Sequence, residues 1–359
     1  MLKNEPKVSI IMSVYNGERY LRDAIESILN QSFKDFEFII INDGSRDSSK
    51  KIVQSYKDPR IVFIENKKNI GLTKSLNKGI KLARGEYVAR MDADDISAYN
   101  RIEKQVNFLD KNKDYCLVGT TFYYIDENNK VIFKKIVPLT NKEIKKGLVK
   151  KNCFAHGSVM IRKKILEKVK GYREEIKYSQ DYDLFIRIAK KCKVRNLKDV
   201  LYKWRMHKES ISMRKHKAQK DYVKLINKKK PLEESEKEES KKEIESRMAN
   251  NYKKYGLEFL RKAIKESDKN KYYIAREHFK KSLKMKSKSL ISWSLLFISY
   301  LPFKTISCIV FIIKKIRKNF FGEKKHLPKK YLIIILVLIF LLSLFVRFLP
   351  IIHKGYSFN

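Results

Sequence analysis

Short apolar runs alternate with amphipathic segments over the first ninety residues of the chain. Residues 8–14 form an apolar run that predicts a buried strand, and residues 17–30 place their apolar side chains on one face of a helix. The same alternation then repeats, with strands predicted at 36–41, 61–64 and 86–91 and helices predicted at 47–56 and from Thr73 onward. This order is typical of an α/β domain with a doubly wound, mainly parallel sheet and helices on both faces.

The pattern is less regular after Asp95 but remains that of a folded domain. A helix is predicted near residues 100–110, an apolar stretch lies at 115–121, and a further helix is predicted at 181–192. The globular pattern ends near Ser212. The first domain is therefore expected to span residues 1–212.

The remainder of the chain is basic and helical. Residues 213–255 are dense in charge and predict a linker or an exposed helix. A basic helical region is expected at 256–330, and its apolar stretch 290–313 is interrupted by Pro302 and Lys304. That break favours a hairpin that lies on or in the membrane, against the alternative of a buried helix in a small C-terminal domain.

The apolar run at 331–350 is the strongest membrane signal, and it predicts a transmembrane helix. Basic residues from Lys314 to Lys330 place that flank in the cytosol by the positive-inside rule. The N-terminus lacks the apolar segment of a secretory signal peptide. We therefore expect a cell-membrane protein with its catalytic domain on the cytoplasmic side, and the tail 351–359 resembles the start of a truncated membrane module.

Charge and cysteine content narrow the class of partner. The formal net charge of +41 favours an anionic partner, either phospholipid headgroups or nucleic acid. The four cysteines are scattered without the spacing of a zinc site or a disulfide framework, which fits a reducing compartment. Neither a structural zinc site nor a disulfide framework is therefore expected to stabilise the fold.

Polar residues follow the predicted strands at their carboxyl ends. Ser13 and Tyr15 lie at the end of the first strand, and Asp43 follows the second, where its carboxylate is suited to accept hydrogen bonds from a nucleobase or ribose. The alternatives are a core-edge tyrosine and an ordinary Asx turn. Because carboxyl ends of parallel strands share one edge, these residues are expected to line one crevice.

The fourth strand ends in Asp92-Ala93-Asp94-Asp95, which brings three carboxylates into the same crevice. Such carboxylates repel one another unless a cation neutralises them. Hard oxygen ligands suit Mn²⁺ or Mg²⁺, and a cation held there can offset charge on a diphosphate leaving group. The alternative is a solvated acidic loop.

The segments 8–16, Asn42-Asp43-Gly44-Ser45 and 92–95 together resemble family 2 glycosyltransferases of the GT-A fold. The resemblance covers roughly residues 5–212 and implies an inverting transferase that uses a nucleotide-diphosphate sugar, with a preference for uridine. By that resemblance Ser13, Tyr15 and Asp43 hold the nucleobase and ribose. Asp94 would be the principal metal ligand, with Asp92 as a second ligand or a contact to the ribose or donor sugar.

An inverting transfer also needs a base for the acceptor hydroxyl. Gln180-Asp181 resembles the family's Glu-Asp pair at a helix start, which implies that Asp181 is the base, with Asp183 as the second candidate. Gln180 departs from the usual glutamate and is expected near the acceptor, and a helix-capping role for Asp181 is compatible with catalysis.

Two further segments resemble family positions. His156 is expected to line the acceptor or donor pocket, while Arg205 and His207 are expected to contact the diphosphate. For each histidine a structural role is the alternative. Membrane attachment points to a glycan or lipid-linked acceptor in cell-envelope polysaccharide synthesis.

Three other functions remain open from sequence alone. An Asp-x-Asp at a strand end also occurs in haloacid-dehalogenase-type phosphatases, although there it follows the first strand. A sugar nucleotidyltransferase would need a glycine-rich basic loop, which is absent after Val14. A basic nucleic-acid-binding protein would fit the charge, but the acidic crevice argues against it, so no nucleic acid is expected as a partner.

Overall fold

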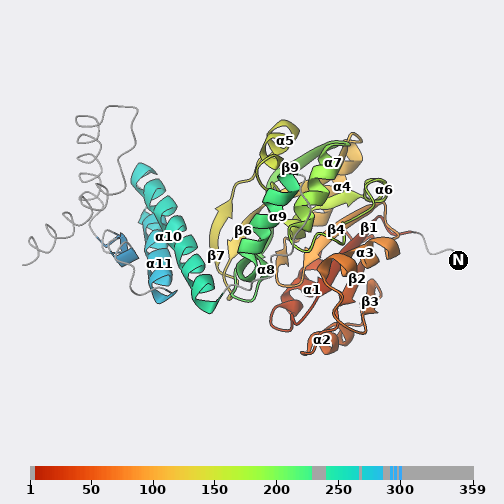
Figure 1. Ribbon diagram of the computed structural model, residues 1–359, viewed down its shortest axis with the longest axis horizontal. Helices are drawn as coiled ribbons and strands as arrows, with labels where there is room; N and C mark the ends of the chain where they lie inside the picture. Colours follow the sequence, from red (N-terminus) through yellow and green to blue (C-terminus); the bar gives the residue numbers. More distant parts are fainter. Residues whose placement is uncertain are drawn as a thin grey trace, which may run out of the picture. The chain divides into compact units, whose positions relative to one another are not determined.

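The computed structural model describes residues 5–228, 240–266, 269–285 and six positions between 292 and 300. The chain divides into two compact units between Glu239 and Ser240. The first unit is an α/β domain and the second begins with two long helices (Figure 1).

Nine strands in the described part of the first unit form one sheet, in the order β3-β2-β1-β4-β8-β6-β9-β5 with β7 paired to β6 (Figure 1). The strands are β1 (Val8–Val14), β2 (Phe36–Asn42), β3 (Ile61–Glu65), β4 (Tyr87–Asp92), β5 (Ile96–Ser97), β6 (Tyr115–Ile125), β7 (Val131–Lys135), β8 (Met160–Arg162) and β9 (Lys193–Arg205). Strands β1 to β4 are parallel, and because β8 is antiparallel to both β4 and β6, β6 and β9 share the direction of β4. The mainly parallel sheet is as predicted.

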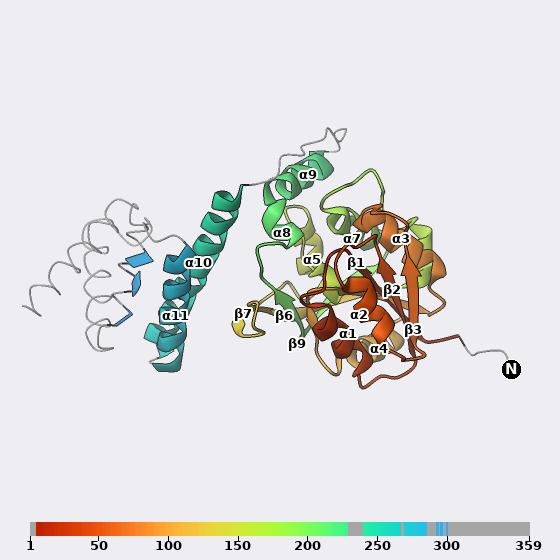
Figure 2. The same cartoon turned by 90° about the horizontal axis from the view of Figure 1, so that it is seen from below.

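Helices cover both faces of this sheet (Figure 2). They are α1 (Leu21–Leu29), α2 (Ser49–Ser55), α3 (Leu72–Leu82), α4 (Arg101–Lys111), α5 (Asn141–Leu148), α6 (Lys163–Lys168), α7 (Gln180–Ala189), α8 (Ile211–Arg214) and α9 (His216–Lys228), with a 3₁₀ turn η1 (His156–Ser158). One core cluster joins the sheet to α1, α2 and α4, and the other joins it to α3, α5, α6 and α7. The apolar runs predicted as strands are buried because a helix layer lies on each side.

The register of the central strands aligns the motifs at their ends. Ser13 on β1 is opposite Asp92 on β4, and Val14 is opposite Asn42 on β2. The residues that follow β1, β2 and β4 therefore meet at one edge, as expected of parallel strands.

The first unit extends past residue 212, where the predicted domain ended. Helix α9 packs through Val223 and Ile226 against the second core cluster, and the ring of Tyr222 lies edge-on to Tyr178 at 5.6 Å between centroids. The start of the predicted charged linker is thus an element of the α/β unit.

One expectation about cysteines is wrong. Cys116 and Cys192 form a disulfide, and Cys153 is free and buried. The pairing of Tyr115 on β6 with Lys193 on β9 brings the two cysteines together from positions 76 residues apart, a proximity that spacing along the chain does not reveal.

Most of the described part of the second unit is a pair of packed helices, α10 (Lys241–Glu266) and α11 (Lys269–Met285). Phe279 on α11 is fully buried and packs directly on Gly256 of α10. The hydroxyl of Ser282 also donates to the Ala249 carbonyl at 2.9 Å. Helix α10 runs through the predicted boundary between a charged linker (213–255) and a helical region (256–330).

No helix in the described ranges has the length and apolarity needed to cross a membrane. The predicted transmembrane helix at 331–350 lies outside the described residues, as does most of the predicted hairpin at 290–313. Both stay predictions.

Candidate active site

The first carboxylate of the acidic cluster is paired with a buried arginine. Asp92 Oδ1 accepts a hydrogen bond from Arg90 Nη2 at 2.6 Å, and the Arg90 side chain is only 4% exposed. Both residues project from the same face of β4 because they are two apart in a strand. Burial raises the pKa of Asp92, and the Arg90 charge acts against that rise.

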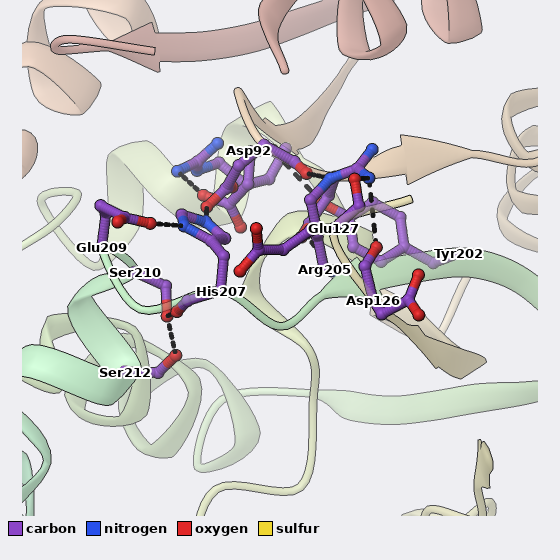
Figure 3. Close-up of polar contacts among 12 residues, drawn as sticks. Asp92, Asp126, Glu127, Tyr202, Arg205, His207, Glu209, Ser210 and Ser212 are labelled. Atoms are coloured by element: carbon purple, nitrogen blue, oxygen red, sulfur yellow. Dashed lines mark hydrogen bonds and ion pairs between the residues drawn. The ribbon is translucent and has the colours of Figure 1, made fainter. Parts of the chain in front are cut away.

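The second carboxylate, Asp94, faces a histidine that follows strand β9. Asp94 Oδ2 lies 2.8 Å from His207 Nε2. On the other side of the ring, His207 Nδ1 lies 3.1 Å from Glu209 Oε2 (Figure 3). Burial lowers the pKa of His207, but the hydrogen bonds and charges of Asp94 and Glu209 outweigh it and leave the pKa raised. The predicted metal ligand and a predicted diphosphate contact therefore lie side by side.

The third carboxylate is structural. Asp95 is 2% exposed, and its Oδ1 accepts from the Arg205 backbone N–H at 2.7 Å. Burial and the charges of Asp94 and Asp92 raise its pKa well above the usual value. Asp95 joins the loop after β4 to the end of β9.

Arg205 links three segments around the site through hydrogen bonds of its guanidinium group. Its side chain has no exposed surface, and it donates to the Asp94 carbonyl at 2.7 Å, to Asn129 and to Asp23 at 3.0 Å. It also donates to the Asp126 carbonyl at 3.3 Å (Figure 3). The predicted contact between Arg205 and the diphosphate is therefore not supported by this geometry, because the guanidinium is already bound to protein groups.

The candidate base lies in the same site. Asp181 is at the first turn of α7, and its Oδ2 accepts from Asn152 Nδ2 at 2.6 Å. Burial raises the pKa of Asp181 to about 6, and the Asp92 charge adds to this rise while hydrogen bonds oppose it. Asp183, the second candidate, is 5% exposed and paired with Arg187 at 2.7 Å, so it is not available to an acceptor.

The other two residues predicted for the acceptor or donor pocket are His156 and Gln180. His156 Nε2 lies 2.7 Å from the Tyr172 hydroxyl, and burial together with the Arg90 charge holds the pKa of His156 well below its usual value. The imidazole is therefore neutral at pH 7. Gln180 is 7% exposed, and it follows Ser179, whose backbone is left-handed with φ 59°.

The residues predicted to hold the nucleoside differ in exposure. Tyr15 is 47% exposed, whereas Asp43 is 2% exposed. The Asp43 carboxylate accepts from Asn66 Nδ2 and from the backbone N–H groups of Ile70 and Gly71 at 2.9 to 3.0 Å. Asp43 thus fixes the loop that leads into α3, while its contact to a nucleobase stays a prediction, as does that of Ser13.

Sequence reasoning missed several residues of the site. Arg90 could have been found as a charged residue inside an otherwise apolar strand. Arg101 is fully buried and donates to the Arg90 and Gly157 carbonyls at 3.0 and 2.6 Å, and burial lowers its pKa to about 10. A Cβ at Gly157 would collide with the Tyr202 hydroxyl and with Asp92 Oδ2. Nothing local in the sequence marks that crowding.

The described residues contain no group of three His, Cys, Asp or Glu side chains arranged to hold a metal ion. The donor set nevertheless fits a cation shared with a ligand, because Asp94 offers a carboxylate, the donor type that Mn²⁺ and Mg²⁺ prefer, on a side chain that is 34% exposed. Asp92 is less available, since one of its oxygens is held by Arg90.

Comparison with known proteins decides the family. A family model described as Glycosyl transferase family 2 matches residues 9–170. An uncharacterized glycosyltransferase of Methanocaldococcus jannaschii is 41% identical over 226 residues, which cover 61% of this chain and 77% of the relative. This chain belongs to glycosyltransferase family 2. Of the functions considered from the sequence, the comparisons support a glycosyltransferase.

Two further relatives and one solved structure are similar to this chain. The O-antigen biosynthesis glycosyltransferase WbnJ of Escherichia coli is 38% identical, covering 56% of this chain and 81% of the relative. The putative glycosyltransferase EpsE of Bacillus subtilis is 38% identical, covering 59% and 78%. A crystal structure of S. aureus TarS with UDP-GlcNAc aligns with a TM-score of 0.49 and 18% identity, covering 82% of this chain and 79% of that one.

Proposed function

We propose that this family 2 glycosyltransferase moves a sugar, with inversion, from a nucleotide-diphosphate sugar to a hydroxyl of a glycan or lipid-linked acceptor. The observation that carries the proposal is the position of Asp181, a partly buried carboxylate with a pKa of about 6 that senses the charge of Asp92. A base with such a pKa is ionised at neutral pH and still accepts a proton readily.

The chemistry assigned to Asp181 is a single proton transfer. As the acceptor oxygen bonds to the anomeric carbon, Asp181 takes the hydroxyl proton and the bond from the anomeric carbon to the phosphate oxygen breaks. The electron pair of that bond leaves with the nucleoside diphosphate. Asn152 orients the carboxylate through its 2.6 Å hydrogen bond to Oδ2.

The donor is assigned to the edge where β1, β2 and β4 end, against Tyr15, Asp43 and Asp92. Mn²⁺ or Mg²⁺ would be held by Asp94, with His207 beside it, and would offset negative charge on the leaving diphosphate. A uridine nucleotide is the expected base, from the resemblance to the family.

The acceptor is assigned to a cell-envelope glycan or its lipid-linked precursor. The name of the relative WbnJ refers to O-antigen synthesis, and the predicted membrane segment would keep the enzyme at the cytoplasmic face of the cell membrane. Both considerations favour an acceptor presented at that surface.

Two variants test the separate roles of Asp94 in metal binding and of Asp181 in proton transfer. A panel of nucleotide sugars is screened for turnover with Mn²⁺ or Mg²⁺, and calorimetry measures metal-dependent nucleotide binding. Asp94→Ala is expected to lose that binding, whereas Asp181→Asn is expected to bind normally and to lose transfer. Asp114→Asn, an exposed carboxylate paired with Lys193, is the control. Unchanged transfer in Asp181→Asn would refute the assignment of the base.

A further inference from the structure

The solvent-facing side of α5 and the turn after it form a basic surface on the first unit. Segment 140–152 contains five lysines and one glutamate. Ile144 and Leu148 turn inward to the second core cluster, which leaves Lys142, Lys145 and Lys146 exposed on the opposite side of the helix. We call the exposed lysines and valine of this segment the α5 surface; they are Lys142, Lys145, Lys146, Val149, Lys150 and Lys151. Thr140 and Glu143 are exposed as well, at the N-terminal end of the helix.

The lysines of the α5 surface are not neutralised within the described residues. The single acidic residue of the segment, Glu143, is bound instead in a capping box with Thr140 and the Leu139 N–H. None of the five lysines forms an ion pair in the part of the chain that the structure describes, whereas lysines elsewhere on this unit, such as Lys104 and Lys193, do. The five lysines outnumber the one carboxylate of the segment, so the surface keeps a positive net charge for an external partner.

An exposed apolar side chain lies among these lysines. Val149 is 68% exposed and lies directly between Leu148 and Lys150. Lysines around an exposed aliphatic group are the combination that binds an anionic bilayer, with the ammonium groups at the phosphates and the apolar group among the upper acyl carbons.

The α5 surface is tied to the candidate base by two contacts. Asn152, which follows Lys151 directly, donates to Asp181 at 2.6 Å. The hydroxyl of Tyr182 donates to the Leu148 carbonyl at 2.5 Å. Contact at the α5 surface would therefore be made by residues adjacent to those that orient Asp181.

We propose that the α5 surface docks the first unit onto an anionic phospholipid bilayer and presents the Asp181 side of the site to that bilayer. The docking stands on the lysines and Val149 alone. The presentation of an acceptor to Asp181 rests on the proposed function.

Hydrogen exchange on the full chain tests the docking. The protein is reconstituted into bilayers of phosphatidylcholine with or without phosphatidylglycerol, and exchange is compared for the peptide covering 142–152. Phosphatidylglycerol is expected to slow exchange in this peptide. Replacing Lys145, Lys146, Lys150 and Lys151 by Gln is expected to remove that effect, since each lysine near an anionic surface changes partitioning by about fivefold.

A matched variant removes the same charge elsewhere on the unit, with Gln at the exposed positions Lys34, Lys51, Lys57 and Lys111. This control is expected to keep the effect of phosphatidylglycerol. Equal exchange in both bilayers, or equal loss in the control, would overturn the docking proposal.

Metal-dependent turnover of the nucleotide sugar is measured without lipid on the same samples. Turnover in wild type and in both lysine variants is the expected result. If none of the three turns over any donor while the lipid effect persists, the proposed function fails and the docking stands.

Discussion

Asp181 sets the expected pH dependence at the scale of single residues. Burial raises the pKa of this carboxyl to about 6, so protonation below that pH removes the base and kcat/KM for transfer is expected to fall as the pH drops through 6. The hydrogen bond from Asn152 opposes the rise, so Asn152→Ala is expected to raise the pKa further and to move the acid limb to higher pH. A pH–rate profile measures the shift.

A control for this profile is Asn128→Ala, which changes an exposed turn residue and is expected to leave the acid limb unmoved. An acid limb identical in wild type and Asn152→Ala would show that Asp181 is not the titrating base.

Asp92 is expected to contribute to stability as well as to donor binding. Its removal leaves the Arg90 guanidinium buried, with Nε and Nη1 already lacking a partner in the described structure. Breaking a buried pair from one side typically costs about 3–5 kcal/mol. Asp92→Ala is therefore expected to lower the free energy of unfolding by several kcal/mol on that scale, as measured by urea denaturation.

The double variant Arg90→Met with Asp92→Ala is the matched comparison, because it removes both charges and is expected to recover much of the loss. Asp94→Ala should cost far less, because its partner His207 can release its proton whereas the guanidinium of Arg90 cannot. If Asp92→Ala and Asp94→Ala were equally stable, the pairing with Arg90 would have no energetic importance.

At the scale of elements, the contact between α10 and α11 depends on a residue without a side chain. A Cβ at Gly256 would lie 2.5 Å from Phe279 Cε1. Overpacking of this kind typically costs about 1–3 kcal/mol. Gly256→Val is expected to destabilise the helix pair, seen as faster hydrogen exchange in α10 and α11, while exchange in the first unit is unchanged.

Adding Phe279→Leu to Gly256→Val shortens the opposing side chain and is expected to restore part of the protection. Exchange unaltered by Gly256→Val would mean that the two helices do not pack at this position.

Elements with continuous apolar runs were the ones that sequence predicted well. Strands β1, β2 and β4 are buried on both faces, so most of their residues are apolar and the run stands out. Strand β8 has three residues, and β9 mixes charged with apolar positions because it is only partly covered, so neither was predicted. The boundary at 212 missed α9 because its buried residues are few among its lysines.

The sequence predicted the site residues that lie at strand ends. It did not predict the contacts between side chains that are far apart in the sequence. Asp92, Asp94 and Asp43 follow parallel strands and must share an edge. Arg205 was assigned to the diphosphate, but its partners Asp23 and Asn129 come from α1 and from the β6–β7 turn, contacts that no local pattern encodes.

At the scale of the whole molecule, the predicted span at 331–350 and the net charge of +41 lead to different modes of membrane attachment. A transmembrane helix resists salt, whereas electrostatic binding weakens as salt screens it. The full chain is expected to sediment with cell membranes, to stay bound in about 1 M salt and to be released by detergent. Release by salt alone would count against the span.

The register that places Ser13 opposite Asp92 also limits how the gene can change in length. One inserted or deleted codon within β1 would turn every later side chain of that strand to the other face, and the donor edge would be lost although each of its residues was still encoded. The turn between β6 and β7, at 126–130, is not part of a strand, so a change in its length does not move side chains from one face of the sheet to the other. Among relatives, length differences are therefore expected to accumulate in turns of this kind and to be absent from β1, β2 and β4.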